Sequence, residues 1–195
     1  MIDFIPPVAP LSRTRIEEMA KSILAKHYPR VLSRPTAIDV VDFCDRVLFE
    51  HYGIACFVDH LAWIDGTEGL ARPDRVVLID EATYRAAVEG DGRSRFTMIH
   101  EAFHSIHHSP QILRAINDQR GSLRRYRKNQ VPAYMDPEWQ ANTFASAFLM
   151  PEQPVRAYLA GRSAASPLSL LISQKFRVSE KAARIRLGKL GIRNQ

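Results

Sequence analysis

The sequence predicts an α+β protein that is mostly helical and contains one small antiparallel or mixed sheet. Three observations lead to this prediction. Apolar residues recur at steps of three and four near the N-terminus and through the second half of the chain, as in amphipathic helices. Between these parts lie short apolar and β-branched runs bounded by Asp-Gly and Pro-Asp turns, which are typical of strands. The end of the chain returns to the helical period and predicts a C-terminal helical hairpin.

The length and composition suit one folded core with a small addition. The chain has 195 residues, of which 46% are hydrophobic. We expect residues 1–151 to form the main domain and residues 152–195 a helical extension packed on it. Cys44 and Cys56 lack the number and spacing of a disulfide framework, which predicts reduced thiols. The chain start does not resemble a signal peptide and no long apolar run follows, so we expect a cytoplasmic protein without membrane association.

Two helices are expected before the first strand. An arm rich in proline precedes them. The first helix is expected from Ser12, because Thr14 and Glu17 have the spacing of a capping box. Asp39 is a suitable N-cap for the second, and Gly53 is a suitable stop. The apolar faces of both helices are expected to pack in the core.

Strands are expected at residues 54–58, 69–71 and 76–79, where the hydrophobic pattern changes its period. A small antiparallel sheet is the simplest arrangement of three strands joined by turns. Residues 82–88 then predict a short helix. The Glu-Gly-Asp-Gly sequence at residues 89–92 predicts a turn that leads into the next helix.

That next helix carries the motif His-Glu-x-x-His. Its two histidines, His100 and His104, are four residues apart and so lie on one face of a helix, where they can bind one metal ion. Glu101 lies off the apolar face and is free to act as a base. The apolar residues recur at helical spacing: Phe96, Ile99, Phe103 and Ile106. The alternative is a surface helix with solvated histidines.

A second helix offers a third ligand. Asp136 is a good N-cap and Pro137 suits the first helical position, while Pro151 marks the end. Glu138 in the first turn can complete a set of three metal ligands. Asn142, one turn later, can hydrogen-bond a ligating histidine and fix its tautomer. The expected buried face comprises Ala141, Phe144, Ala145 and Phe148. Alternatively, Glu138 only interacts favourably with the helix dipole.

Together the two helices resemble the ImmA/IrrE family of metallopeptidases. The matching positions are Phe96 and Thr97, His100, Glu101 and His104, His108, and then Glu138, Ala141, Asn142, Phe144, Ala145, Phe148, Leu149, Met150 and Pro151. One position departs from the family pattern, because Phe103 stands where a glycine usually precedes the second histidine. We expect this substitution to narrow the site locally.

The resemblance implies a zincin-like fold in which His100, His104 and Glu138 hold zinc or manganese. Glu101 is then the general base, and Asn142 supports the ligands. The implied activity is that of a metallo-endopeptidase that cleaves a helix-turn-helix repressor and so derepresses its genes, typically under stress. In such folds one strand can pair with the substrate backbone. The strand at 76–79 is our candidate, with a plain interior strand as the equal alternative.

The rest of the cleft is less well defined by the sequence. His107, His108, Tyr126 and Tyr134 are candidate cleft residues, although His108 could instead cap its helix. We expect that helix to end at Pro110, before a polar stretch. Basic residues surround Tyr126 in this stretch: Arg120, Arg124, Arg125, Arg127 and Lys128. They could contact phosphate groups or form a solvated loop that gates the cleft.

The C-terminal helices leave two interpretations open. Apolar stripes at residues 168–176 and 182–190, with Ser179 as the N-cap between them, resemble a helix-turn-helix. The second helix is basic through Lys181, Arg184, Arg186 and Lys189. With a net charge of +6 and a pI near 9.6, this pattern could serve DNA contact. The hairpin could instead complete the peptidase core, which we favour. A metal-binding transcriptional regulator and a non-catalytic repressor antagonist are therefore the alternative functions.

Overall fold

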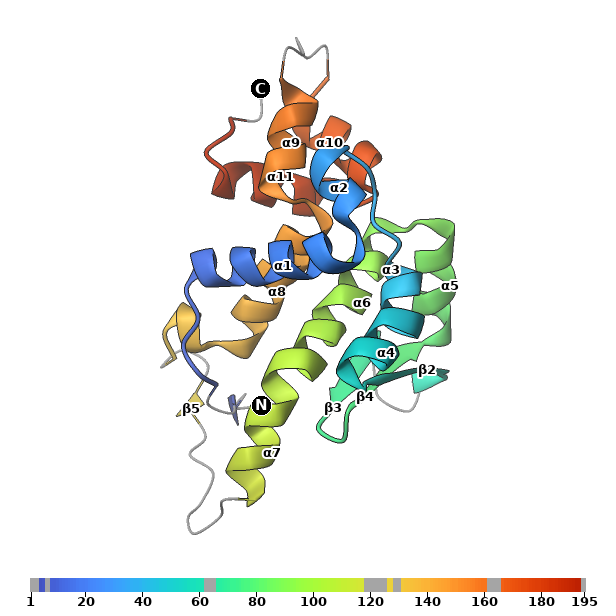
Figure 1. Ribbon diagram of the computed structural model, residues 1–195, viewed down its shortest axis with the longest axis vertical. Coiled ribbons are helices and arrows are strands. Elements are labelled where there is room, and N and C mark those ends of the chain that lie inside the picture. The colour runs from blue at the N-terminus through green and yellow to red at the C-terminus, as the bar shows by residue number, and fades with distance from the viewer. Residues whose placement is uncertain are drawn as a thin grey trace.

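The computed structural model describes residues 4–5, 8–61, 66–117, 126–127, 131–160 and 166–193 (Figure 1). Its helices are α1 (Arg13–His27), α2 (Pro29–Ser33), α3 (Val40–Asp42), η1 (Phe43–Val47), α4 (Leu48–Tyr52), α5 (Glu81–Glu89), α6 (Gly92–Phe103), η3 (His104–His108), α7 (Ser109–Asn117), η5 (Ala133–Met135), α8 (Pro137–Leu149), α9 (Glu152–Leu159), α10 (Leu168–Phe176) and α11 (Glu180–Lys189). Its strands are β1 (Phe4–Ile5), β2 (Ala55–Asp59), β3 (Gly69–Arg72), β4 (Val76–Asp80) and β5 (Tyr126–Arg127). The predicted α+β class, mostly helical with a small mixed sheet, is confirmed. None of the described helices is long and apolar enough to cross a membrane.

The first helix begins where the sequence predicts, but with a different cap. The side chain of Ser12 accepts a hydrogen bond from the backbone N–H of Arg15, so Ser12 is the N-cap of α1. The capping box predicted for Thr14 and Glu17 is therefore wrong. Glu17 instead extends its carboxylate to Arg186 of α11, and this distant partner could not be read from local spacing.

The second predicted helix is present as one continuous run from α3 through the π-helical segment η1 to α4. Asp39 caps it by accepting from the N–H of Asp42 at 3.0 Å. Gly53 ends it in the left-handed conformation, with φ of 62°, which glycine adopts without steric cost. The short helix α2 lies between the two helices that the sequence predicts.

The sheet is mixed, with the strand order β2-β4-β3. β3 pairs with β4 in antiparallel fashion, but β2 pairs with β4 in parallel, so of the two predicted arrangements, antiparallel and mixed, the sheet has the mixed one. The reason is that β4 inserts between β2 and β3, with Val77 and Ile79 fully buried. A central strand has both edges occupied and cannot pair with a substrate, so the interior alternative holds for residues 76–79. β3 is the edge strand that faces α6.

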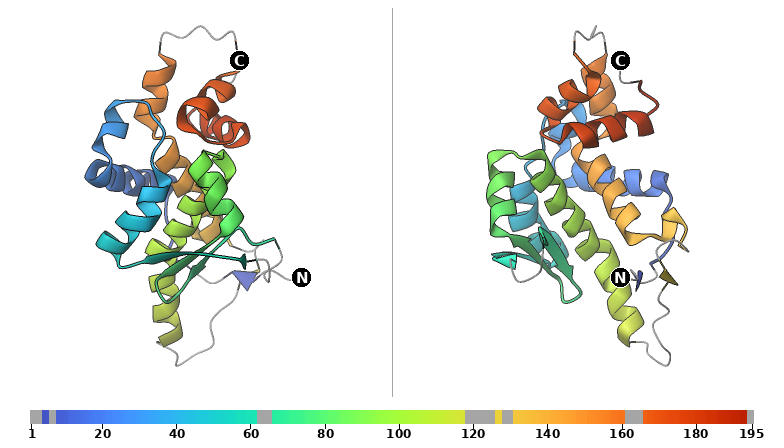
Figure 2. Two further views of the ribbon diagram at one scale, coloured as in Figure 1. Left: turned by 90° about the vertical axis from the view of Figure 1, so that its right-hand side faces the viewer. Right: turned by 180° about the vertical axis from the view of Figure 1, so that it is seen from behind.

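The helix that carries His100 and His104, called the metal helix below, does not end at Pro110. α6, the π-helical segment η3 and α7 form one long rod that crosses the molecule (Figure 2). The N–H of Ser109 donates to the carbonyl of His104, five residues back. Inside an α-helix a proline has no backbone N–H to donate, and its ring clashes with the carbonyl of the residue four positions earlier. The wider π turn displaces that carbonyl, which lets the helix continue through Pro110.

α6 packs against α8 in the centre of the core. The ring of Phe103 is fully buried and stacks on Phe144, with 4.4 Å between the ring centroids. Further along α8, Phe148 packs on Phe43 at 4.8 Å. Phe103 therefore fills the space between two helices and, contrary to expectation, does not narrow the site. The predicted buried face of α8 is fully buried.

The N-terminus of α6 also packs on the turn between α10 and α11. Arg95 Nε donates to the carbonyl of Arg177 at 2.9 Å. A Cβ atom added to Gly92 would lie 2.3 Å from the carbonyl carbon of Val178 and 2.4 Å from the nitrogen of Ser179. This backbone contact requires glycine at position 92 and fixes the C-terminal hairpin against the metal helix.

Arg186 fastens the hairpin from the other side. Its side chain is 1% exposed, donates to both carboxylate oxygens of Glu17 and donates to the carbonyl of Met150 at 3.0 Å. The bidentate pair with Glu17 joins α11 to α1. The hydrogen bond to Met150 joins α11 to the end of α8. Arg186 is one of the basic residues that the sequence offers for DNA contact, and its burial excludes it from that role.

Candidate metal centre

The three predicted ligands lie together. His100 Nε2 and His104 Nε2 are 3.0 Å apart, and the carboxylate oxygens of Glu138 lie 3.2 Å from the first and 3.3 Å from the second. All three donor atoms fall within 4.8 Å of one another. Asp136 caps α8 by accepting from the N–H of Glu138 at 2.9 Å, which fixes the first turn beside the histidines.

The electrostatics of this cluster suit a shared cation. Burial opposes protonation of His100, but the hydrogen bond to Glu138 and the charge of Glu101 outweigh it, so the pKa of His100 is raised. Hydrogen bonds from His100 and then His104 lower the pKa of Glu138. Two ring nitrogens and a carboxylate that lie this close together form the donor set that zinc-like divalent ions prefer, and two of these residues, His100 and Glu138, also line a cavity. The residues therefore fit a divalent ion.

Glu101 lies beside the three ligands. Its Oε1 is 4.0 Å from His100 Nε2, while its Oε2 accepts a hydrogen bond from the backbone N–H of Ala71 at 2.9 Å. Gly69 on the same strand makes this position possible, because a Cβ there would lie 2.8 Å from Glu101 Cγ. The edge strand β3 thus holds the carboxylate at the metal site through its backbone.

An open cavity of about 350 Å³ gives access to this cluster. Its walls come from the loop before β3, from β3 itself, from α6 and from α8, and comprise Gly66, Glu68, Gly69, Arg93, Phe96, Thr97, His100, Glu101, Glu138 and Asn142. A hydrogen bond that the His100 ring donates to Asn142 contributes to the raised pKa of His100. Asn142 is therefore positioned for the supporting role that the sequence predicts.

A chain of hydrogen bonds fixes the proton on His104. Gln140 Nε2 donates to the carbonyl oxygens of Ala9 and Tyr134, at 3.0 and 2.8 Å. A carbonyl oxygen can only accept a hydrogen bond, so the NH₂ group of the amide must face these two atoms. Its Oε1 must therefore face His108 Nε2, 3.0 Å away, and accept a hydrogen from it. Burial, and then the neighbouring His104, lower the pKa of His108 to about 3, so the ring is neutral and its Nδ1 accepts. His104 Nδ1, at 2.9 Å, must donate, so in the neutral ring that a metal ion requires the lone pair of His104 lies on Nε2, the nitrogen that faces Glu138.

The three predicted cleft residues whose side chains the structure describes, His107, His108 and Tyr134, do not line the described cavity. His108 is 1% exposed and supports His104 from behind. His107 stacks on Phe103 at 5.3 Å, and its buried Nε2 has no hydrogen-bond partner among the described residues. Tyr134 exposes its ring and contributes its carbonyl to Gln140. His108 keeps its contact with His104, four residues earlier, but its other ring nitrogen faces Gln140 of α8 and not the cavity.

Some predictions concern residues outside the described part of the chain. Arg120, Arg124, Arg125 and Lys128 are not described. Tyr126 and Arg127 are described only as backbone in β5, which pairs with β1. The expected gating or phosphate-binding loop therefore stays a prediction.

Three contributors were missed by reasoning from the sequence. Gln140 precedes Phe144 and Phe148 at steps of four, so an amide occupies the apolar face of α8. A buried amide in such a position requires hydrogen-bond partners, and this signal could have identified it. Gly69 and Ala71 act through the absence of a side chain and through a backbone N–H, and no sequence pattern marks these roles.

Comparison with known proteins agrees with this geometry. The chain is similar in structure to a Mycobacterium tuberculosis transcriptional regulator, with a TM-score of 0.56 and 19% sequence identity. The match covers 89% of this chain and 46% of that protein, so this chain spans about half the length of the regulator, and at this identity the likeness shows the fold alone. None of the curated proteins compared with the chain matches it. Residues 87–188, which include both histidines and Glu138, match the model of Peptidase_M78, described as the IrrE N-terminal-like domain. Because this match covers more than half of the chain, the protein belongs to the Peptidase_M78 family of IrrE N-terminal-like domains.

Proposed function

We propose that the protein is a metal-dependent endopeptidase in which His100, His104 and Glu138 hold zinc or manganese. The observation that carries this proposal is the convergence of these three donors within 4.8 Å, with Glu101 held beside them by a backbone N–H. A purely structural metal site has no use for an adjacent carboxylate outside the ligand set. Membership of a metallopeptidase family supports the same reading and implies a metal ion.

The bound ion and Glu101 have separate roles in the proposed peptide hydrolysis. A divalent ion, when bound, supplies Lewis-acid chemistry that polarises a peptide carbonyl and lowers the pKa of water. Glu101 accepts the proton of the attacking water while a new bond forms between the water oxygen and the carbonyl carbon. Glu101 then delivers that proton to the amide nitrogen as the carbon–nitrogen bond breaks. The products are one new carboxylate and one new amine.

The substrate in this proposal is a helix-turn-helix transcriptional repressor in the cytoplasm, whose cleavage derepresses its genes. This part rests on the family resemblance. The cavity is compatible with an extended peptide segment, because it is open and Gly69 of the edge strand β3 is among its walls. Recognition of a particular protein requires contacts beyond the three ligands.

The test is cleavage of the repressor encoded beside the gene, followed by intact mass with zinc or manganese present. We expect one defined cut that is lost in Glu101→Gln, because the amide cannot accept a proton but retains an oxygen that can accept from Ala71. Glu89→Gln is the matched control, since Glu89 is an exposed residue at the end of α5. It should cut normally.

Binding of the repressor without a cut by the wild-type protein would contradict the proposal and favour a non-catalytic antagonist. Retained cleavage by Glu101→Gln would remove Glu101 from the mechanism. Specific operator binding without repressor binding would favour the metal-binding regulator.

A further inference from the structure

A second hollow continues from the metal cavity toward the C-terminal hairpin. It measures about 440 Å³ and shares Arg93, Phe96, Thr97 and Asn142 with the cavity around the ligands. The remaining walls come from α8 and α11. In the view from behind, α10 and α11 lie across the ends of α6 and α8 (Figure 2, right). We call these two connected spaces the extended groove.

The centre of the extended groove is apolar. Phe96 on α6 faces Ala182 and Ile185 on α11 across the hollow. Ile185 is 47% exposed, although a large aliphatic side chain on a helix normally packs inward. Ser146 at the base is buried, and its hydroxyl has no hydrogen-bond partner among the described residues. The surface is thus suited to a peptide with apolar side chains.

The metal cavity is lined by the carboxylates of Glu68, Glu101 and Glu138, but the other end of the extended groove, beside the C-terminal hairpin, carries an excess of positive charge. Lys181 and Lys189 line it from α11, and Arg93 lines it from α6. In the part of the chain that the structure describes, no carboxylate lies within salt-bridge distance of either lysine, whereas Arg93 is paired with Glu68. Burial, and then the charges of Arg13 and Arg186, lower the pKa of Lys189, while the charge of Glu17 opposes the shift.

We propose that the extended groove recognises a substrate segment that combines apolar and acidic side chains close to the cleaved bond. This proposal rests on the proposed peptidase function where it calls the bound segment a substrate. Binding of such a segment to the groove does not require cleavage. Charge complementarity selects acidic residues, and continuity with the metal cavity places them on the same chain as the scissile bond.

The geometry predicts where the acidic residues lie. Seven residues separate His100 from Arg93 on α6, which corresponds to about 10 Å along the helix axis. An extended peptide advances about 3.3 Å per residue, so it reaches Arg93, which is already paired with Glu68, about three residues from the cut, and the acidic positions are expected beyond that point, at Lys181 and Lys189. Lys181 and Lys189 are about 12 Å apart along α11 and extend the recognised segment further on the same side.

Binding can be measured without cleavage by using the Glu101→Gln protein loaded with zinc. The probe is a fluorescent twelve-residue peptide in which acidic residues alternate with leucine, and the reference is the same peptide with lysine in place of the acids. We expect the acidic probe to bind about ten-fold more tightly at low salt, with the difference shrinking as salt rises.

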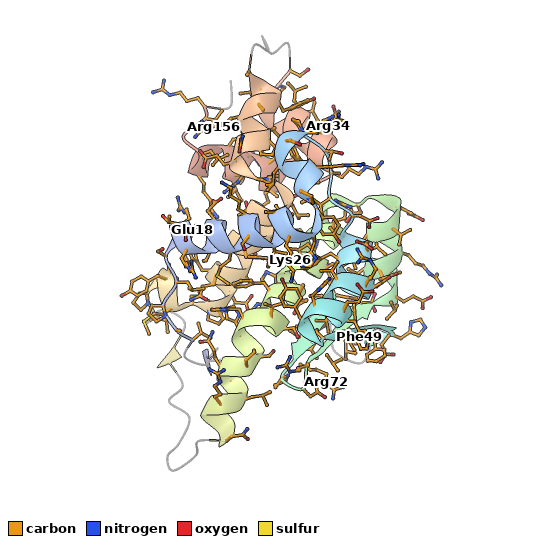
Figure 3. All side chains as sticks on the ribbon, viewed as in Figure 1. Glu18, Lys26, Arg34, Phe49, Arg72 and Arg156 are labelled. Carbon is orange, nitrogen blue, oxygen red and sulfur yellow. The ribbon has the colours of Figure 1, made fainter. Side chains whose placement is uncertain are left out.

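The variant that tests the groove is Lys181→Glu combined with Lys189→Glu. Lys21→Glu combined with Lys26→Glu changes the net charge equally on α1, where both lysines are exposed and Lys26 projects from the front face (Figure 3). We expect the groove variant to lose about ten-fold in affinity for the acidic probe and the α1 variant to lose less than two-fold. Unchanged melting temperature and zinc affinity show that the groove variant folds, and Lys181→Ala alone serves if it does not.

Equal binding of the acidic and basic probes, or equal losses in the two double variants, would overturn the proposal. The proposal would also be overturned if an unrelated DNA duplex bound the wild-type protein more tightly than the acidic probe does and the groove variant lost this DNA binding. In that case α11 would contact nucleic acid. If the acidic probe binds the groove but active protein cuts neither it nor any repressor, the peptidase function fails while the groove stands. If cutting occurs without acidic preference, the groove fails alone.

Discussion

Gln140 Oε1 lies 3.0 Å from His108 Nε2, and this contact determines the proton positions along a path from α8 to the metal site. Two carbonyls fix the orientation of the Gln140 amide, the amide fixes the His108 tautomer, and His108 fixes the tautomer of His104. A metal ligand whose lone pair is already directed at the ion loses less freedom on binding. The following predictions test this relay and its surroundings.

Replacing His108 by phenylalanine should weaken zinc binding. The change removes the acceptor for His104 Nδ1–H while keeping a ring of similar size in the core. We expect a loss of about 10- to 100-fold in affinity, measured by competition with a chromophoric chelator. His107→Phe is the matched control, because the same substitution is made one residue away, where the ring nitrogen Nε2 has no hydrogen-bond partner among the described residues. Equal affinities in the two variants would show that the relay does not tune the ligand.

The metal-free protein should lose stability as the pH falls from neutrality. The pKa of His108 is about 3 when folded and about 6.5 when unfolded, so the unfolded chain binds more protons between these values. The contribution of His108 to the free energy of unfolding therefore decreases through this window, by up to about 1.4 kcal/mol per pH unit. The lowered pKa of Glu138 adds a further loss below its unfolded value of 4.5, whereas the raised pKa of His100 favours the folded state at acid pH.

Urea unfolding at pH 7 and pH 5 measures this dependence in the presence of a chelator. We expect a shallower pH dependence in His108→Phe than in wild type. The same slope in both proteins would assign the acid sensitivity to other groups.

Gly92→Ala should destabilise the protein, whereas Gly188→Ala should stabilise it. The new methyl group at position 92 meets the backbone of Val178 and Ser179, which can yield only if α6 separates from the hairpin. We expect a cost of about 1–3 kcal/mol. At position 188, within α11, nothing lies within 4 Å and alanine should contribute about 0.5–1 kcal/mol. Chemical denaturation measures the change in the free energy of unfolding in both variants. An unchanged free energy of unfolding in Gly92→Ala would refute the close contact.

Gly69→Ala should slow cleavage without weakening metal binding. Its Cβ would lie 2.8 Å from Glu101 Cγ, so the flexible carboxylate must leave the N–H of Ala71. Misplacement of a catalytic group by about 1 Å can lower the rate about 100-fold. Turnover at saturating substrate and zinc affinity, measured on the same preparation, separate this effect from a loss of the ion. A normal turnover would mean that the contact with β3 does not position the base.

Removal of the metal should lower the melting temperature. An ion that binds only the folded state stabilises it by about 2.7 kcal/mol at a hundred-fold excess over its dissociation constant. Glu138→Gln removes the carboxylate that faces both histidines and should suppress most of this stabilisation. Melting curves with added zinc, manganese or chelator provide the measurement. A full zinc-induced shift in the variant would exclude Glu138 as a ligand.

The sequence by itself determined the helices that carry the metal centre. The spacing of His100 and His104, the cap at Asp136 and the position of Glu138 are local features within one or two helical turns, where geometry follows directly from the order of residues. The apolar stripes likewise identified which faces of α1 and α8 are buried.

Tertiary structure alone decided the features that join distant segments. Insertion of β4 between β2 and β3, the contact of His108 with Gln140 and the pair of Arg186 with Glu17 each depend on where other elements lie. Hydrophobic periodicity specifies which face of an element is buried but not which neighbour covers it, and a hydrogen bond needs both partners in place. The π turn that carries the helix past Pro110 has the same origin, because it alters the helix geometry from which local spacing is interpreted.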